Sequence, residues 1–138
     1  MRSKQTLSAI SIWVWMVLLF ALALVIRLFH ITDTDIAGDE PFSIFIAHLS
    51  VSDIVSQLAK DNSPPLFEIV LHYYLSWFGV SDLSVRLLPT LFSSIVPPVL
   101  FLIGGRFFNW RVGLTAALLA IFSIYHIRFA HEVRVYAL

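Results

Sequence analysis

The chain has 138 residues, of which 59% are apolar and 13% are charged, and its mean hydropathy is +0.86. A typical soluble domain carries about 25% charged residues, so this composition argues against a soluble globular enzyme. Nine basic and nine acidic residues cancel, which argues against a nucleic-acid partner, and the absence of cysteine excludes disulfides, thiolate metal sites and cysteine nucleophiles.

At roughly 20 residues per membrane span, the chain is long enough for a handful of apolar helices. The first is predicted over residues 10–29, inside an uncharged stretch (residues 5–26) that follows Arg2 and Lys4. Because basic residues favour the cytoplasmic side, we expect an uncleaved span whose N-terminus is cytoplasmic. A cleaved secretory signal is the alternative, but the apolar stretch is longer than a usual signal-peptide core.

An acidic outer loop is predicted over residues 30–86, and it holds all but one of the nine carboxylates. Within it, apolar residues recur at helical spacing over residues 41–60. This pattern predicts two short amphipathic helices on the membrane surface, the second capped by Ser50 or Ser52.

A further short helix is predicted over residues 65–80, directly after Pro64. It is short for a span, and its Glu68 and His72 would be costly to place in lipid. We therefore expect it to lie at the outer membrane surface, or to re-enter the membrane without crossing it.

Two more spans are predicted over residues 87–105 and 112–130, joined by a basic, aromatic turn at residues 106–111. The positive-inside rule puts this turn in the cytoplasm, on the same side as the N-terminus. The fold class is therefore all-α, a polytopic membrane protein with three transmembrane helices plus outer-face juxtamembrane helices. Such a protein fits the inner or plasma membrane of a bacterium.

Asp39 and Glu40 are the leading candidates for chemistry, because they follow the first span closely and lie at the membrane surface. Two interpretations remain open: the pair caps a helix N-terminus, or it acts as a general base beside a lipid-borne substrate. Glu68 and His72 share a helix face at the spacing of metal ligands, but such a pair is more often a polar face turned to water.

Arg134 is suited to a phosphate group, since its planar guanidinium can donate two parallel hydrogen bonds. The alternative is an interfacial arginine that lies beside the belt residue Tyr136. The three-span topology places the acid pair and residues 131–136 on one face of the membrane, so that the two segments can meet.

Several ordered motifs resemble the N-terminal part of the dolichyl-phosphate-mannose–protein mannosyltransferase superfamily. This superfamily has the GT-C fold and includes bacterial lipid A glycosyltransferases and oligosaccharyltransferase catalytic subunits. The resemblance covers essentially the whole chain. The motifs are Gly38-Asp-Glu40, Ser63-Pro-Pro-Leu-Phe67, Leu71-His-Tyr-Tyr74, Ser84-Val-Arg-Leu87, Gly104-Gly-Arg-Phe-Phe108 and His131-Glu-Val-Arg-Val-Tyr-Ala-Leu138.

The resemblance implies a transferase that takes its sugar from a polyprenyl-phosphate donor on the extracytoplasmic face. Asp39, with Glu40 beside it, would act as base or position the acceptor. Arg134 would bind the donor phosphate. The donor pocket would further be lined by His131, Glu132 and Tyr136. No metal or other cofactor is predicted, although some members of the superfamily bind a divalent cation; the acceptor is not specified.

We expect residues 1–138 to form one N-terminal GT-C membrane module of a longer, truncated enzyme, inactive as a fragment. A non-catalytic small membrane protein or assembly subunit that keeps the fold is the alternative. A transporter or channel component is disfavoured, because the acids lie in the outer loop and do not interrupt the spans.

Overall fold

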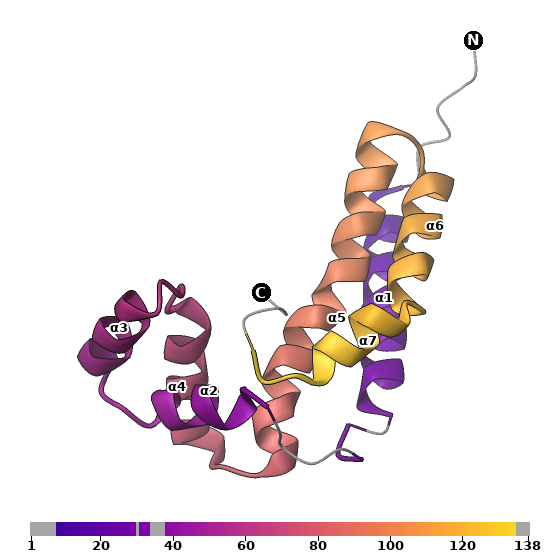
Figure 1. Cartoon of the computed structure of the whole chain (residues 1–138). Coiled ribbons are helices and arrows are strands. Elements are labelled where there is room, and N and C mark those ends of the chain that lie inside the picture. Colours follow the sequence, from indigo (N-terminus) through magenta and orange to yellow (C-terminus); the bar gives the residue numbers. More distant parts are fainter. Residues whose placement is uncertain (1–7, 30, 34–37, 135–138) are drawn as a thin grey trace.

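The structure is a computed structural model that describes residues 8–29, 31–33 and 38–134. These residues form helices and no strand, which confirms the predicted all-α class (Figure 1). The helices are α1 (Ala9–Leu28), α2 (Glu40–Ala47), α3 (Val51–Lys60), α4 (Leu66–Phe78), α5 (Asp82–Phe107), α6 (Trp110–Ile121) and α7 (Ile124–His131).

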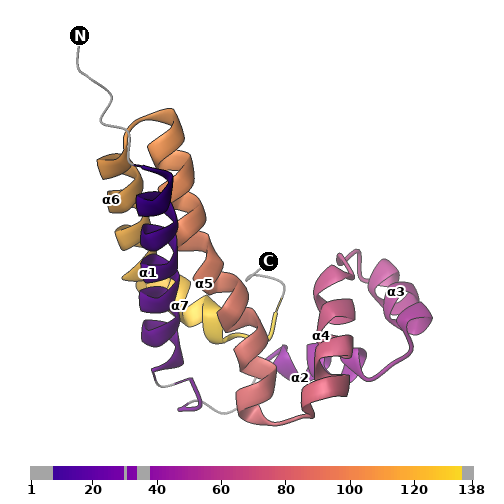
Figure 2. The same cartoon turned by 180° about the vertical axis from the view of Figure 1, so that it is seen from behind.

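Three helices, α1, α5 and α6, lie side by side as a bundle in both views (Figures 1 and 2). The beginning of α1 lies at the same end of the bundle as the α5–α6 connection. Helices α2, α3 and α4, here called the outer helices, lie beside the opposite end, where α5 begins. The arrangement therefore separates an apolar bundle from a smaller unit that carries most of the acids.

Helices α1 and α5 are long and apolar enough to cross a membrane. The observed α1 agrees with the predicted helix at residues 10–29. Helix α5, however, begins at Asp82 and not at residue 87, because Ser81 and Ser84 form a capping box that starts it earlier. At about 1.5 Å per residue, α5 is roughly 39 Å long and exceeds a hydrocarbon core of about 30 Å.

The prediction of one continuous helix over residues 112–130 is wrong, because α6 and α7 are separate and bent by 55° at the break between them. The hydroxyl of Ser123 caps the new helix by accepting from the His126 backbone N–H. Arg27, fully buried on α1, donates to the Ala120 carbonyl at the end of α6 at 3.3 Å. Side chains therefore bind free backbone groups on both sides of the break: a carbonyl at the end of α6 and an N–H at the start of α7. The two helices count as a third span only if they cross the membrane together as one bent unit.

Glycines bring α5 and α6 into close contact. A Cβ atom at Gly104 would overlap the backbone of Gly113, and a Cβ at Gly113 would overlap the carbonyl oxygen of Phe101. Small residues allow such close backbone approach in membrane bundles, where packing and not water exclusion drives helix association. The two glycines thus fix the α5–α6 hairpin.

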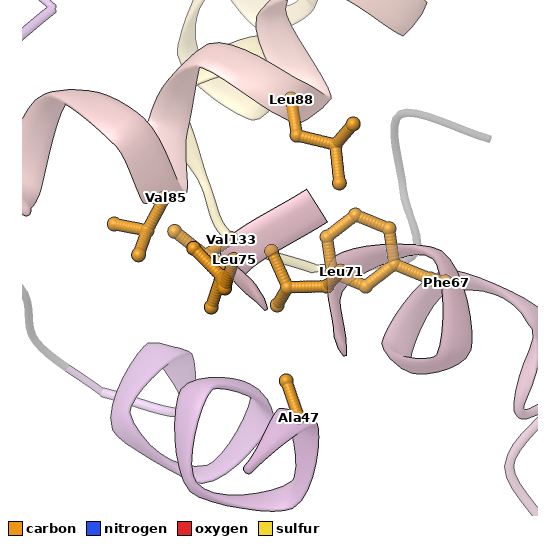
Figure 3. Close-up of a cluster of buried hydrophobic side chains, with 7 residues drawn as sticks. All are labelled: Ala47, Phe67, Leu71, Leu75, Val85, Leu88 and Val133. Atoms are coloured by element: carbon orange, nitrogen blue, oxygen red, sulfur yellow. The ribbon is translucent and has the colours of Figure 1, made fainter. Parts of the chain in front are cut away.

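The outer helices confirm the short helices predicted within residues 41–60 and 65–80. Ser50 caps α3 by accepting from the Asp53 backbone N–H, as predicted. Their main core lies between α4 and α5 and includes Val133, from the segment after α7 (Figure 3). This core joins the outer helices to the bundle; its buried members are Ala47, Phe67, Leu71, Leu75, Val85, Leu88 and Val133.

Candidate functional site

The beginning of α2 and the segment after α7 meet at the junction between the bundle and the outer helices. Arg134 Nη2 lies 3.1 Å from Asp39 Oδ2. The Asp39 side chain is 74% exposed and that of Arg134 is 26% exposed, so this ion pair, here called the exposed pair, is open to solvent. The expectation that the acid pair and the Arg134 segment come together is confirmed by these contacts.

Asp39 occupies the N-cap position of α2, yet its side chain makes no capping hydrogen bond. The preceding Gly38 has a φ of +61°, a left-handed conformation that glycine adopts at little cost, and Pro41 suits the first turn of the helix. The Asp39 carboxylate instead pairs with Arg134. Helix capping therefore does not account for this side chain.

Glu40 lies in a different environment, although it is the next residue. Its carboxylate is buried, Oε2 lies 3.4 Å from Arg86 Nη2, and Oε1 accepts from the Val133 backbone N–H at 2.9 Å. Arg86 also donates to the Ile31 carbonyl at 3.0 Å. Glu40 and Arg86 are here called the buried pair. Their contacts connect α2, α5, the segment that follows α1 and the segment that follows α7. These contacts hold the start of α2 in place, and the predicted catalytic role of Glu40 stays a prediction.

The other predicted donor-pocket residues contact different partners. His131 Nε2 donates to the Arg27 carbonyl at 2.6 Å and so ties the end of α7 to α1. Glu132 Oε1 lies 4.0 Å from Arg128 Nε, a solvent-exposed contact of two residues four apart. Tyr136 lies outside the described residues. The structure thus brings Arg134 to the acid pair, whereas His131 and Glu132 contact Arg27 and Arg128.

The sequence pattern suggested that Glu68 belongs to a polar surface that faces water, but the structure does not place it there. It is buried on α4, and burial raises the pKa of its carboxyl. His72, one turn further on, donates from Nδ1 to the Ala47 carbonyl at 2.8 Å. The described residues contain no group of three or more His, Cys, Asp or Glu side chains that could hold a metal ion.

Two arginines that the sequence pattern left without a role make buried contacts, Arg86 at the junction and Arg27 within the bundle. Arg86 lies one turn into α5, whose other charged residues, Asp82 and Arg106, are at its two ends, and Arg27 is the only charged residue of α1. Arg27 donates to Ser93 Oγ at 3.0 Å and to two backbone carbonyls. A lone arginine inside an apolar helix is the signal that identifies both, because burying its charge requires partners.

No family model, curated protein or solved structure matches this chain. The fold and the junction described above are therefore the basis for any functional assignment.

Proposed function

We propose that the chain is a module of a membrane glycosyltransferase that takes its sugar from a polyprenyl-phosphate donor. The observation that carries the proposal is the exposed pair: a carboxylate and a guanidinium 3.1 Å apart, beside the end of an apolar bundle. Transfer from a lipid-linked sugar phosphate needs a base for the acceptor and a cation for the phosphate, both close to the membrane surface. The sequence motifs that resemble GT-C transferases support the same function.

The chemistry assigns one task to each member of the exposed pair. Asp39 accepts the proton of the acceptor hydroxyl or amine as that atom attacks the anomeric carbon. The bond between the anomeric carbon and the phosphate oxygen breaks, and the electron pair leaves with the polyprenyl phosphate. Arg134 stabilises the negative charge on this leaving group through charge-assisted hydrogen bonds. Glu40, held by Arg86, fixes the start of α2 from which Asp39 projects.

The proposed topology has three spans, α1, α5 and the bent α6–α7 pair, in the inner or plasma membrane of a bacterium. The N-terminus and the α5–α6 turn are cytoplasmic, and the junction faces the extracytoplasmic side. Two observations support this: the start of α1 and the α5–α6 turn share one end of the bundle, and Arg106 and Arg111 flank that turn.

Cysteine labelling tests this topology, because the chain has no cysteine of its own. A reagent that cannot cross the membrane should label Ser63→Cys in intact cells and should not label Phe108→Cys until the cells are opened. Both positions are exposed in the structure, so accessibility on the protein itself is matched. The reverse pattern, or equal labelling, would contradict the three-span arrangement.

A non-catalytic assembly protein is the second candidate, and one observation favours it. Both acids of the predicted catalytic pair already have arginine partners, Arg134 and Arg86, which is how a purely structural junction would look. The two functions differ in what removal of one charge does. A structural junction predicts that Asp39→Asn changes nothing beyond a small loss of stability.

The deciding experiment is transfer from polyprenyl-phosphate sugars in membranes that contain the protein expressed from its full reading frame. Asp39→Asn and Arg134→Ala should each abolish transfer, and Asp61→Asn, an exposed acid at the end of α3, serves as the matched control. Normal transfer by Asp39→Asn would refute the proposed role of Asp39 as the base.

A further inference from the structure

Glu68 has a buried carboxyl group, one oxygen of which has no hydrogen-bond partner among the described residues. The residue lies on α4 and is 6% exposed, and its Oε2 makes no hydrogen bond within the described part of the chain. The hydroxyl of Ser43, on α2, is fully buried and likewise unpartnered there. Because α2 packs against α4, two unsatisfied polar groups lie inside the outer helices. Buried polar groups without partners are rare and call for an explanation.

Burial is the largest influence on Glu68, and it raises the pKa of the carboxyl. Smaller influences lower the pKa: the residue's own backbone N–H, then the positive charge of Arg134, then the nearby Ser43 hydroxyl. The Ser43 effect is weak, since the two side chains do not reach hydrogen-bond geometry. Arg134 is therefore the charged group that acts on Glu68.

The elements that pack against α4 carry other charged groups, and these are already engaged or exposed. On α2 and α5, Glu40 and Arg86 pair with each other. On α3, the Asp53 carboxylate accepts from the Ser50 hydroxyl and Lys60 is exposed. On α4 itself, His72 donates to the Ala47 carbonyl.

Arg134 therefore pairs with the exposed Asp39, and its positive charge also acts on the buried Glu68. If Glu68 is neutral, Arg134 and Asp39 have no net charge, and an arriving anion can displace the exposed carboxylate from the guanidinium. If Glu68 is ionised, the three groups carry one net negative charge, which repels the anion.

We propose that Glu68 is a positioning residue that holds a proton, keeps Arg134 available to a lipid-borne phosphate and thereby lets the phosphate release Asp39 as the base. This inference rests on the proposed function. The ligand chemistry is a phosphodiester attached to an apolar tail. Donor binding and activation of the base are then one event, because the same guanidinium holds either the Asp39 carboxylate or the phosphate.

The first test asks whether Glu68 is neutral, and it needs no activity. The infrared spectrum of the purified full chain in non-ionic detergent at neutral pH should contain the carbonyl stretch of a protonated carboxylic acid. This band should disappear in Glu68→Gln, a neutral isostere, and persist in Asp61→Asn. A wild-type spectrum identical to that of Glu68→Gln in this region would overturn the inference, whatever the protein's function is.

The second test asks whether the proton controls phosphate binding. The probe is a short prenyl methyl phosphodiester, whose single charge is constant with pH, in non-ionic micelles that contain no phosphate. As the pH rises through the raised pKa of Glu68, the wild-type affinity should fall about tenfold, the effect of one nearby charge in partly solvated surroundings. Glu68→Gln should match the wild-type at acidic pH and keep that affinity throughout. Parallel pH profiles for the two proteins would refute the role of Glu68.

Further comparisons separate the inference from the function on which it rests. Probe binding that survives in Arg134→Ala would contradict the donor-phosphate site, while the infrared band would still report on Glu68. Dimethyl phosphate, which has no tail, should bind at least tenfold more weakly than the prenyl probe. Equal binding of the two would contradict the assignment to a lipid-borne phosphate.

Discussion

Asp39 and Glu40 are adjacent in the sequence, but their side chains lie in different environments, one exposed and the other buried. Glu40 and Arg86 form a buried pair that joins four segments of the chain, whereas Asp39 and Arg134 form an exposed pair at its edge. Burying charges is costly unless each has a partner, so the loss of either member of the buried pair removes the ionic partner of a buried charge. An exposed pair contributes little to stability and is free to exchange partners. The difference separates an anchor from a candidate site of chemistry.

The largest expected effect is on the buried pair. Arg86→Ala leaves the Glu40 carboxylate buried without its arginine and removes the bond to the Ile31 carbonyl. We expect a loss of about 3–5 kcal/mol in the free energy of unfolding. Denaturant titration of the detergent-solubilised protein measures it, with Arg111→Ala, at an exposed position in the α5–α6 turn region, as the control. A loss similar to that of the control would show that the junction does not depend on this pair.

A smaller effect is expected at Val133, which connects the two environments. Its side chain is fully buried between α4 and α5, and its N–H binds Glu40, while the next residue is Arg134 (Figure 3). Val133→Ala removes two methyl groups and should cost about 2 kcal/mol. The same titration measures it. If stability falls and phosphate-probe binding falls as well, the exposed pair depends on the buried core; unchanged stability would contradict the packing described.

Glu68 should make stability depend on pH in a defined direction. Its folded-state pKa is raised above the unfolded value, so the folded protein binds more protons. Its stabilising effect is complete below the unfolded pKa and is lost as the pH rises through the raised folded pKa. Glu68→Gln should therefore flatten the decline in stability over that window. Unfolding titrations at several pH values test this, and an unchanged slope in the variant would count against a neutral Glu68.

The smallest effect on stability is expected for the exposed pair itself. Asp39→Asn and Arg134→Ala should each change the free energy of unfolding by about 1 kcal/mol or less, because solvent screens both charges. A double-mutant cycle measures their coupling. A coupling comparable to that of the buried pair would remove the distinction between the two pairs.

The helices were largely predictable from the sequence, because apolar periodicity and length decide them. The all-α class, the first span and the short outer helices follow from such patterns. The break between α6 and α7 did not, since no glycine or proline marks it, and Arg27, which donates to the Ala120 carbonyl before the break, is far away in the chain. The early start of α5 depends on a local serine pair that the apolar run obscured.

The candidate site was predictable in part. Motif order and topology brought Asp39 and Arg134 together, but no local pattern separates the exposed Asp39 from the buried Glu40. That difference arises from Arg86 and Val133, which approach from two distant segments. The burial of Glu68 is likewise a tertiary effect of α2 packing against α4, and sequence spacing suggested a water-facing residue instead.

The central claim is that the exposed pair performs chemistry while the buried pair holds the structure. It is tested most directly by measuring sugar transfer from a polyprenyl-phosphate donor and thermal stability together, on the same membrane preparation of Asp39→Asn. We expect transfer to be lost while the melting temperature stays close to that of the wild-type protein. Retained transfer at wild-type stability would contradict it.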